Sequence, residues 1–390
     1  MARLMLEVKV KKALEGFDLD VDFSVNKEIL SIMGPSGSGK TMTLRCIAGL
    51  VKPDEGYIKL NGRVLFDSEH GLCLPARLRR IGFVFQNYAL FSHLTVAENI
   101  AYGIKNLPQR VVRERVAQLI ELMHLPGLEH RYPRELSSGQ QQRVAMARAL
   151  APEPEALLLD EPFSALDTPR RERLEYEILQ LQKFYEGDIL FVTHDLTEGY
   201  KLGSRIAIYE NGRIVQCDRK NNVISTPVNP TAARLAGVKN LMQGYVKSVS
   251  DSRVEVFIPE LGMPLKVINK QNLSLTENQE VIIGIRPEHI NIATGGRDNV
   301  IPCQVNEIIE GAIDIRGRDN IIPCQVNEII EGVIDIHCHL YSSADEARKY
   351  TIEMISPRSS SPDICEGHTY DFYLPPEHLI IVPASQDNSA

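Results

Sequence analysis

The first 235 residues alternate short apolar runs with longer segments of helical periodicity. A largely apolar run at 28–33 leads into a glycine-rich turn, and helical periodicity follows over 41–50. Wholly apolar runs occur at 156–159 and at 189–192. Runs of this kind are typical of central parallel strands that are covered by helices on both faces. The pattern therefore predicts a layered α/β domain.

Helical periodicity dominates the segment that follows Gln86, over about 87–150. Turn signals at 125–127 and at 132–133 divide this segment into several helices, and no strand pattern interrupts them. We interpret it as a helical subdomain inserted into the sheet of the first domain.

After Pro230 the sequence pattern changes to one of short strands and turns with few long helical periods, which predicts a separate β-rich domain. We place the two domains at 1–235 and 236–390. The second domain contains a nearly identical tandem repeat, because 296–315 recurs at 317–336. Ancient structural repeats retain their residue pattern while their residue identities diverge. A recent duplication or a sequence error therefore explains this near-identical repeat better than a solenoid. If both copies are real, they compete for one place in a sheet.

Length and composition narrow the class of protein. A chain of 390 residues is long enough for two domains. No apolar run approaches the roughly 20 residues of a membrane-spanning helix, and the chain does not begin like a signal peptide, so we expect a cytoplasmic location. The net charge of −8 argues against non-specific nucleic-acid binding. Seven cysteines without zinc-like spacing favour reduced thiols.

A candidate phosphate-binding loop lies at 34–41, between the predicted strand and helix. It matches the pattern of glycine, four residues, glycine, lysine, and serine or threonine. In such a loop the backbone N–H groups face phosphate oxygens, the lysine adds a charge, and the hydroxyl binds magnesium. The following helix directs its N-terminus at the same anion. The predicted nucleotide-binding residues are Gly34, Pro35, Ser36, Gly37, Ser38, Gly39, Lys40, Thr41 and Met42.

Two adjacent carboxylates follow the apolar run at 156–159. Asp160 stands at the edge of the predicted sheet where ligands bind, and it is suited to hold magnesium. Successive residues of a strand point to opposite sides, so Glu161 can face an attacking water while Asp160 faces the metal. An acidic pair after a strand is more often a solvated turn, but the upstream phosphate-binding loop favours a catalytic role.

Four further segments match motifs of one protein family in that family's order. Gln86 matches a Q-loop, Leu-Ser-Ser-Gly-Gln at 136–140 a signature segment, Ser-Ala-Leu-Asp at 164–167 a D-loop, and His194 a switch histidine. Together with the phosphate-binding loop, they make the first 235 residues resemble the ATP-binding cassette (ABC) ATPases of membrane importers. The resemblance implies a P-loop NTPase cassette fold, hydrolysis of ATP, and ATP and Mg²⁺ as cofactors.

The resemblance also implies an active site that two subunits share in a head-to-tail homodimer. The implied catalytic residues are Glu161, His194 and Gln86, and the implied magnesium-binding residues are Thr41, Gln86 and Asp160. Nucleotide contacts outside the phosphate-binding loop are expected from Ser137, Gly139, Gln140 and Asp167. The implied partners are a second copy, integral membrane permease subunits and, indirectly, an external solute-binding protein. This arrangement places the chain at the cytoplasmic face of the cell membrane.

Two positions depart from the family pattern. Ser138 stands where the family usually has glycine, so the signature backbone is expected to have less conformational freedom. No aromatic residue is an obvious partner for the adenine ring. Phe17 is the nearest candidate for that role, but its alternation with Leu19 and Val21 favours a core strand instead.

Several segments are similar to the molybdate-import branch of the family. They include the stretch at 57–86 before the Q-loop, and, in the second domain, 240–246 and Ile-Arg-Pro-Glu-His at 285–289. In the second domain they resemble small oligomer-binding (OB-like) barrels, which in some relatives bind the transported oxyanion and regulate uptake. We therefore expect an importer of molybdate, tungstate or a similar oxyanion, with a regulatory second domain.

Other functions stay open. An importer ATPase for sulfate, ferric iron or sugar shares the same motifs, and a soluble, non-transport ABC ATPase is a different class. Such soluble proteins usually carry two cassettes or a long coiled-coil insertion, and the sequence shows neither. A zinc site is a third alternative, with candidate ligands at His337, Cys338, His339, Cys365 and His368. Alternation along a strand would separate Cys338 from its two neighbours, so ordinary exposed side chains are favoured.

Overall fold

A computed structural model describes the chain except for residues 1–4, 165, 167, 184, 251, 271, 293–298, 311–334, 343–350, 358–368 and 384–390. It divides into two compact units, Met1–Val223 and Ile224–Ala390. The division falls within α7 (Lys220–Ser225), shortly before α8 (Pro230–Leu235). In the described residues no helix combines the length and the apolar character that crossing a membrane requires.

The first unit is built on one 11-stranded sheet of order β6-β5-β4-β1-β2-β11-β10-β3-β9-β8-β7. The strands from β10 to β7 are parallel to one another, whereas those from β6 to β2 are antiparallel. The strand bounds are β1 (Leu6–Leu14), β2 (Phe17–Val25), β3 (Ile29–Met33), β4 (Glu55–Leu60), β5 (Arg63–Asp67), β6 (Leu72–Cys73), β7 (Ile81–Val84), β8 (Ala156–Asp160), β9 (Asp188–Val192), β10 (Arg205–Glu210) and β11 (Arg213–Arg219).

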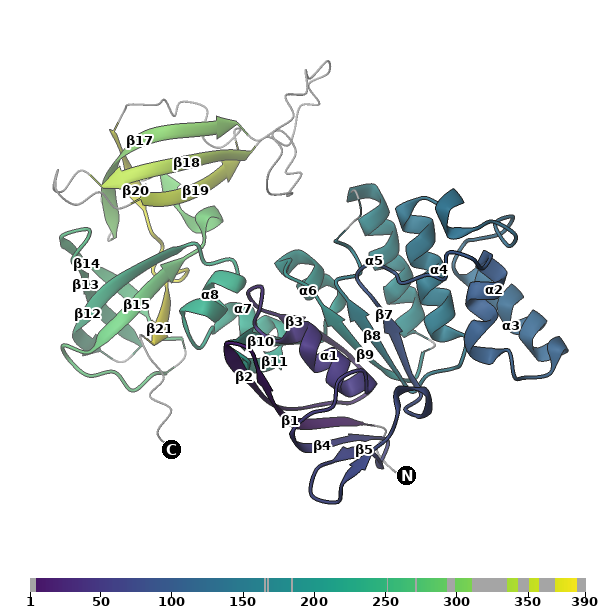
Figure 1. Cartoon of the computed structure of the whole chain (residues 1–390). Helices are drawn as coiled ribbons and strands as arrows, with labels where there is room; N and C mark the ends of the chain where they lie inside the picture. The colour runs from purple at the N-terminus through teal and green to yellow at the C-terminus, as the bar shows by residue number, and fades with distance from the viewer. Residues whose placement is uncertain are drawn as a thin grey trace, which may run out of the picture. The chain divides into compact units, whose positions relative to one another are not determined.

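The apolar runs of the sequence form the centre of this sheet. Every residue of β3, β8 and β9 is buried, as expected for strands that are covered on both faces. The covering helices are α1 (Lys40–Ala48), α2 (Val96–Ala101), α3 (Gln109–Leu122), α4 (Ser138–Leu150), α5 (Thr168–Gln182) and α6 (Leu196–Leu202). Figure 1 shows α2 to α5 gathered beside β7 and β8, and α1 packs on β7, β8 and β9. The helical insertion predicted after Gln86 is present as α2, α3 and α4.

Local signals in the sequence place the ends of these helices. At α2, the Thr95 side chain accepts a hydrogen bond from the Glu98 backbone, and the Glu98 carboxylate accepts one from the Thr95 backbone. Asp195 caps α6 by accepting hydrogen bonds from two backbone N–H groups. Each cap satisfies backbone donors that the first turn of a helix leaves unpaired. The α6 cap also fixes the start of the helix immediately after His194.

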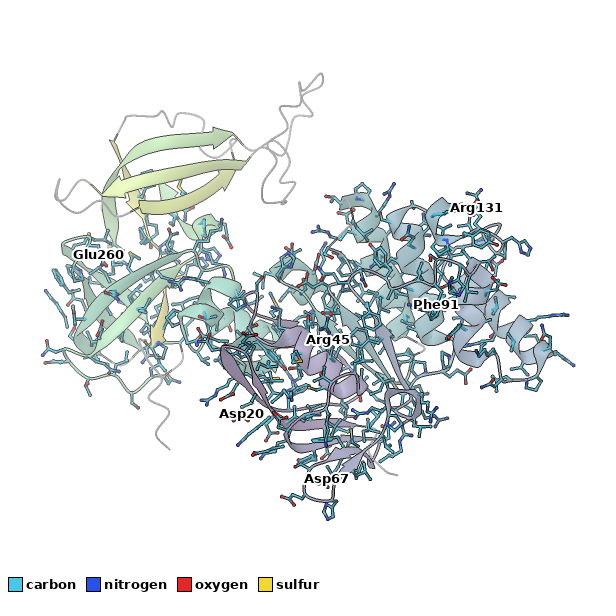
Figure 2. All side chains as sticks on the ribbon, viewed as in Figure 1. Asp20, Arg45, Asp67, Phe91, Arg131 and Glu260 are labelled. Carbon is cyan, nitrogen blue, oxygen red and sulfur yellow. The ribbon has the colours of Figure 1, made fainter. Side chains whose placement is uncertain are left out.

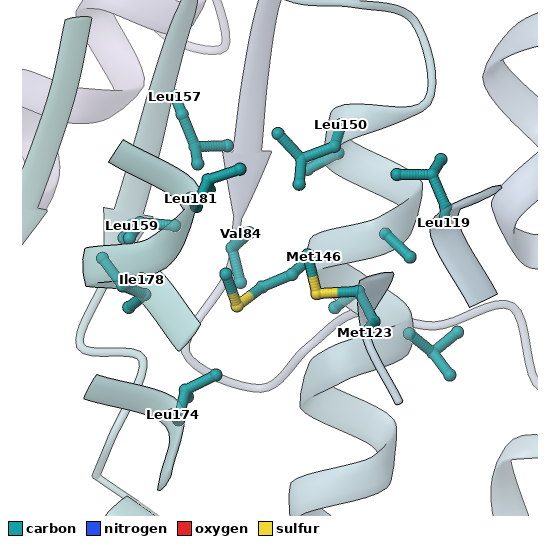
Figure 3. Packing of buried hydrophobic residues seen from close by; sticks show 14 of the residues in the cluster. Val84, Leu119, Met123, Met146, Leu150, Leu157, Leu159, Leu174, Ile178 and Leu181 are labelled. Carbon is teal, nitrogen blue, oxygen red and sulfur yellow. The ribbon is translucent and has the colours of Figure 1, made fainter. Parts of the chain in front are cut away.

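One hydrophobic cluster joins the helical insertion to the parallel strands. Figure 3 shows Met146 and Leu150 of α4 between the strand residues Val84 and Leu157 on one side and Leu119 on the other. Leucine and isoleucine side chains of α5 close the cluster against β8. Burying a side chain of this size contributes about 1.5–3 kcal/mol. The insertion is therefore packed on the sheet by α4, the helix that begins in the signature segment.

The second unit is sheet-rich, which confirms the prediction of a β-rich C-terminal region. Its two five-stranded sheets have the orders β14-β13-β12-β15-β21 and β16-β20-β17-β18-β19. The bounds are β12 (Asn240–Ser250), β13 (Arg253–Ile258), β14 (Met263–Ile268), β15 (Glu280–Ile285), β16 (Asn291–Ile292), β17 (Val300–Glu310), β18 (Asp335–Ser342), β19 (Thr351–Pro357), β20 (Thr369–Tyr373) and β21 (Ile380–Pro383). A short 3-10 helix, η4 (Pro287–His289), follows β15.

The first copy of the repeat forms β17, which pairs with β18 and β20. Most of the second copy lies in 311–334, outside the described residues, and its last residues begin β18. Competition between the copies for one place in a sheet therefore stays a prediction.

Candidate active site

The glycine-rich loop joins β3 to α1 and requires glycine at several positions. Gly37 and Gly39 have φ values of 79° and 99°, which other residues rarely adopt. A Cβ atom on Gly34 would lie 2.5 Å from the Tyr209 carbonyl oxygen, and one on Gly39 would lie 2.8 Å from a methyl carbon of Leu19. The loop is thus seated against β10 and β2 with room for backbone only. It leads directly into the N-terminus of α1, where an anion is favoured.

Lys40, the first residue of α1, folds back over this loop. Its Nζ donates hydrogen bonds to the carbonyl oxygens of Gly34 at 2.7 Å and Pro35 at 2.8 Å. Burial lowers the pKa of Lys40, whereas the charges of Glu161 and Asp160 act in the opposite direction. Lys40 is only 7% exposed, and both acceptors of its ammonium group belong to the loop, so its charge is concentrated there. A phosphate oxygen is the natural acceptor for such a group.

Thr41 and Asp160 come together at the carboxyl end of β8. Thr41 Oγ1 donates to Asp160 Oδ1 at 2.7 Å, and Asp160 is 4% exposed. Burial raises the pKa of Asp160, and the hydrogen bond from Thr41 opposes that shift. A hydroxyl and a carboxylate oxygen are hard ligands of the type that Mg²⁺ prefers. The hydroxyl oxygen of Ser38 in the adjacent loop is buried without a hydrogen-bond partner among the described residues. These donors fit magnesium and a bound phosphate.

Glu161 occupies an unusual backbone conformation. β8 ends at Asp160, so the strand alternation expected to turn the two carboxylates apart does not extend to Glu161. Instead Glu161 has a φ of 46°, in the left-handed region that costs a non-glycine residue about 1 kcal/mol or more. Its N–H donates to the Val192 carbonyl of β9 at 3.2 Å, and its own carbonyl accepts from Ser164. A left-handed residue, rather than strand alternation, therefore directs the carboxylate.

The Glu161 carboxylate is the point where the other two predicted catalytic residues converge. Gln86 Nε2 donates to Glu161 Oε2 at 3.1 Å. The same oxygen lies 3.9 Å from His194 Nδ1. Gln86 follows β7, Glu161 follows β8 and His194 follows β9, three strands that are neighbours in the sheet. The structure thus brings Gln86, Glu161 and His194 together at the carboxyl edge of the parallel strands, where open α/β sheets bind ligands.

The signature segment forms the N-terminus of α4. Ser137 Oγ accepts from the Gln140 backbone at 3.4 Å, and Gln140 Oε1 accepts from the Ser137 backbone at 2.9 Å, which completes a capping box. Ser138 lies in the first turn of the α-helix, so the serine there meets no backbone strain. Gly139 is buried in the same turn. Among the described contacts, none joins this segment to the glycine-rich loop of its own chain. Asp167 lies outside the described residues.

Comparison with known proteins identifies the family. A family model described as ABC transporter matches residues 19–164. A spermidine/putrescine import ATP-binding protein of Trichodesmium erythraeum is 38% identical over 293 residues, which cover 73% of this chain and 75% of that protein. The chain belongs to the ABC transporter ATP-binding proteins. Its activity is ATP hydrolysis coupled to transport, and it is the ATPase subunit of an importer.

Two further proteins support this assignment. A sulfate/thiosulfate import ATP-binding protein of Xylella fastidiosa is 44% identical over 240 residues, which cover 60% of this chain and 66% of that relative. The solved structure of cbiO1 from Clostridium perfringens, part of the ABC transporter complex cbiONQ, matches with 28% identity and a TM-score of 0.51 over 57% of this chain and 90% of that one. The cassette fold predicted from the sequence is confirmed. These relatives do not single out the molybdate branch.

Sequence reasoning missed a contact between the signature helix of this ABC ATPase and its Q-loop. Arg148 of α4 donates to the carbonyl oxygens of Tyr88 at 2.8 Å and Ala89 at 2.7 Å. Both acceptor residues have left-handed backbones, with φ values of 60° and 45°. The Arg148 guanidinium carbon also lies 5.3 Å from the centre of the Phe91 ring, labelled in Figure 2. Arg148 therefore stabilises a strained loop immediately after Gln86.

The same helix reaches the segment after Glu161. Gln142, a buried side chain of α4, donates from its amide to the Pro162 carbonyl. Through Arg148 and Gln142, α4 contacts the loops that follow both Gln86 and Glu161. No local sequence signal marks these two roles, because a polar residue among the alanines of a helix is usually exposed.

Replacing Arg148 with glutamine should lower kcat about tenfold and leave the KM for ATP nearly unchanged. The loss of hydrogen bonds from a charged donor costs about 1.5–3 kcal/mol, and it releases the loop that positions Gln86. Steady-state ATPase kinetics would measure this split, at a temperature well below the unfolding transition.

Arg115→Gln is the matched control, because Arg115 also donates to helix-end carbonyls, those of Leu150 at 3.1 Å and Ala151 at 3.4 Å, but does not contact the Q-loop. Equal loss of kcat in both variants would show that Arg148 acts only through the stability of the fold and not through the Q-loop.

The other predicted nucleotide contacts take ordinary positions in the fold. Met42 is half-buried and packs against a hydrophobic cluster to which both the antiparallel and the parallel strands contribute. Phe17 is half-buried at the start of β2, and its ring lies 3.4 Å from the position of a Cβ atom built on Gly39. Leu19 and Val21 are buried on the same face of the strand. Phe17 thus lies next to the glycine-rich loop, and adenine stacking on it stays a prediction.

Proposed function

We propose that this ABC ATPase binds Mg-ATP in a head-to-tail homodimer on the cytoplasmic face of the membrane and drives uptake of a small oxyanion such as molybdate, tungstate or sulfate. The observation that carries the hydrolytic part is the convergence of Gln86 and His194 on Glu161 Oε2, beside the hydrogen-bonded pair of Thr41 and Asp160. A carboxylate held in this way is suited to remove a proton from water.

The residues of one chain suggest how hydrolysis proceeds. Lys40 would exchange its bonds to the Gly34 and Pro35 carbonyls for oxygens of the β- and γ-phosphates. Thr41 and Asp160 would hold magnesium, Asp160 through water, and Gln86 would reach the same region. When bound, magnesium neutralises charge that develops on the phosphate oxygens. Glu161 would accept the proton of the attacking water on its carboxylate.

His194 would orient the water and the γ-phosphate during this step. Its ring nitrogen lies 3.9 Å from Glu161 Oε2, close enough for one adjustment of the side chain to make a hydrogen bond. The His194 side chain is 69% exposed, so it is free to turn toward a bound phosphate.

A second copy of the chain would complete the site. Ser137, Gly139 and Gln140 lie at a helix N-terminus at which Ser137 is exposed and which has no described contact with its own glycine-rich loop. Such a helix end favours an anion. We propose that it contacts the γ-phosphate bound to the partner, with Asp167 at the same interface. ATP would then join the two subunits and hydrolysis would release them.

The transported solute is a separate part of the proposal. Support for an oxyanion comes from the similarity of 57–86 and the second domain to the molybdate branch, and from the relative named for sulfate/thiosulfate import, at 44% identity. A polyamine is the second candidate, because the relative named for spermidine/putrescine import matches 73% of this chain, against 60% for the sulfate relative. We propose a regulatory role for the second domain and contact with permease subunits through the helical insertion.

Reconstitution with its permease subunits should show which solute stimulates hydrolysis. The ATPase rate would be measured while molybdate, tungstate, sulfate and spermidine are titrated, each with and without the external solute-binding protein. Stimulation by an oxyanion alone is the expected result. Stimulation by spermidine alone would contradict the oxyanion proposal, and a response to none of them would redirect it to ferric iron or sugar. The Glu161→Gln variant is the control for rates that do not come from this subunit.

A further inference from the structure

The switch histidine lies in a short segment that connects β9 to α6. This segment consists of Thr193, His194 and Asp195. The His194 side chain is 69% exposed, and among the described residues its ring makes no hydrogen bond, since Glu161 Oε2 lies 3.9 Å from Nδ1. The place of the ring beside Glu161 therefore depends on the backbone that carries it.

Thr193 holds that backbone on the side of β9. It is 1% exposed, and its N–H donates to the Ile32 carbonyl of β3 at 3.1 Å. Its hydroxyl oxygen accepts a hydrogen bond from the Asp195 N–H at 2.9 Å and donates one to Glu198 Oε2. Because a hydroxyl has one proton to donate, the bond to Glu198 leaves the lone pairs of the oxygen for the Asp195 N–H. The hydroxyl thus closes a turn around His194.

Arg171, in the first turn of α5, holds the other side of the same segment. α5 packs against α6. Arg171 Nη1 lies 3.6 Å from Asp195 Oδ2 and 3.5 Å from Glu198 Oε1. The other oxygen of Asp195 accepts from the Thr197 and Glu198 backbones at the start of α6. One guanidinium therefore contacts both carboxylates that fix the neighbours of His194.

Glu198 is a buried carboxylate at the centre of these contacts, with 8% of its side chain exposed. Burial raises the pKa of Glu198 to about 7, and the hydrogen bond from Thr193 opposes that shift. The charges of Asp195 and Glu175 also raise this pKa, whereas Arg171 lowers it. The carboxylate is therefore charged mainly above pH 7, and a buried charge is tolerated only with partners of this kind.

We propose that Glu198 and Arg171 are positioning residues for the switch histidine. Acting through the residues on either side of it, they would hold the His194 ring within reach of Glu161 and of a bound γ-phosphate. Neither residue has a described contact with Glu161 or with the glycine-rich loop, so loss of either should slow turnover while ATP still binds. The inference rests on the proposed role of His194 in orienting the attacking water.

Steady-state ATPase kinetics of the full chain would test the route through Thr193. The measurement is made at about pH 8, where about nine in ten Glu198 carboxylates are charged. Thr193→Val removes the hydroxyl with little change of shape, and Thr193→Ser retains it. We expect kcat to fall about 10- to 100-fold in Thr193→Val with the KM for ATP nearly unchanged, and Thr193→Ser to stay within about threefold of the wild type. Equal losses in the two variants would contradict a role of the hydroxyl.

Ser31→Ala is the matched control. Ser31 is a buried residue of β3 whose hydroxyl also bonds α6, by donating to the Gly199 carbonyl at 3.0 Å. It has no described contact with Thr193 or Asp195, so kcat should stay near the wild-type value. A loss as large as that in Thr193→Val would show that any loosening of α6 slows hydrolysis, and it would overturn the proposal.

Arg171→Gln provides a second test that does not open the core, since the Arg171 side chain is 26% exposed. We expect kcat to fall about tenfold with an unchanged KM for ATP, and Arg171→Lys to restore part of the loss. Arg173→Gln is the control, because Arg173 lies on the same helix and pairs with Glu177 instead. Wild-type kcat in both Thr193→Val and Arg171→Gln would refute the assignment.

A His194→Ala background separates positioning of the ring from general damage. Once the imidazole is absent, Thr193→Val should slow single-turnover hydrolysis by less than about twofold further. A further loss as large as in the wild-type background would show that the effect does not pass through His194. Hydrolysis at the wild-type rate in His194→Ala alone would contradict the proposed function, whereas a slow His194→Ala with fully active Thr193→Val and Arg171→Gln would contradict only this inference.

Discussion

Replacing Glu161 with glutamine should leave ATP binding intact and reduce hydrolysis by about 100- to 10,000-fold, the usual contribution of a general base. Glutamine has nearly the same shape, so the left-handed backbone at φ 46° and the bond from its N–H to Val192 should survive. The amide cannot take a proton from water. It also presents either an oxygen or an NH₂ group to Gln86 Nε2, which now donates to Oε2 at 3.1 Å.

Single-turnover hydrolysis together with equilibrium nucleotide binding would measure the two effects separately. Glu114→Gln, which removes an exposed carboxylate on α3, is the control and should behave like the wild type. Hydrolysis at the wild-type rate in Glu161→Gln would remove Glu161 from the catalytic role. Loss of nucleotide binding in that variant would show instead that Glu161 contributes to the binding of ATP before hydrolysis.

Replacing Lys40 with alanine should act on the earlier step and weaken ATP binding about 10- to 100-fold. A charge-assisted hydrogen bond is worth about 1.5–3 kcal/mol, and Lys40 is expected to make such bonds to phosphate. Its bonds to Gly34 and Pro35, at 2.7 and 2.8 Å, also hold the loop in its present form. Because the ammonium group is buried beside Asp160, its removal leaves that carboxylate with one fewer compensating charge.

Isothermal titration with ATP would test this prediction. Lys201→Ala is the control, since Lys201 pairs with Glu175 on the α5–α6 side and does not contact the loop. An affinity within a factor of two of the wild type would contradict a phosphate-binding role for Lys40. The two active-site variants together should separate binding from turnover, with Glu161→Gln losing mainly the second and Lys40→Ala mainly the first.

Much of the fold and part of the site could be predicted from local patterns. The apolar runs that became β3, β8 and β9 are buried along their whole length, as predicted. The spacing of Gly34, Lys40 and Thr41 predicted a loop between strand and helix, and the structure has that arrangement. These predictions hold because each signal, whether hydrophobic periodicity, a glycine turn or a helix cap, is set by residues only a few positions apart in the sequence.

Other features depend on contacts between distant parts of the chain. Arg148 meets the Q-loop across about 60 positions of sequence, and Gln86 meets Glu161 across 75. Neither meeting has a local signal, and the left-handed backbone of Glu161 replaced the strand alternation that had been expected. That Ser137 and Asp167 of one subunit contact the nucleotide site of the other stays a prediction.

Local pattern was enough to predict the layered α/β unit, the sheet-rich second unit and the residue types of the phosphate site, because these depend on periodicity and on chemistry carried by a short segment. Three features became visible only in the folded chain: the side chains that meet at the Glu161 carboxylate, the contacts of α4 with the loops after Gln86 and Glu161, and the contacts that hold the residues on either side of His194. Each of those arrangements depends on how separate strands and helices pack, since strand order in a sheet is set by burial of whole faces and not by the residues that happen to meet at its edge.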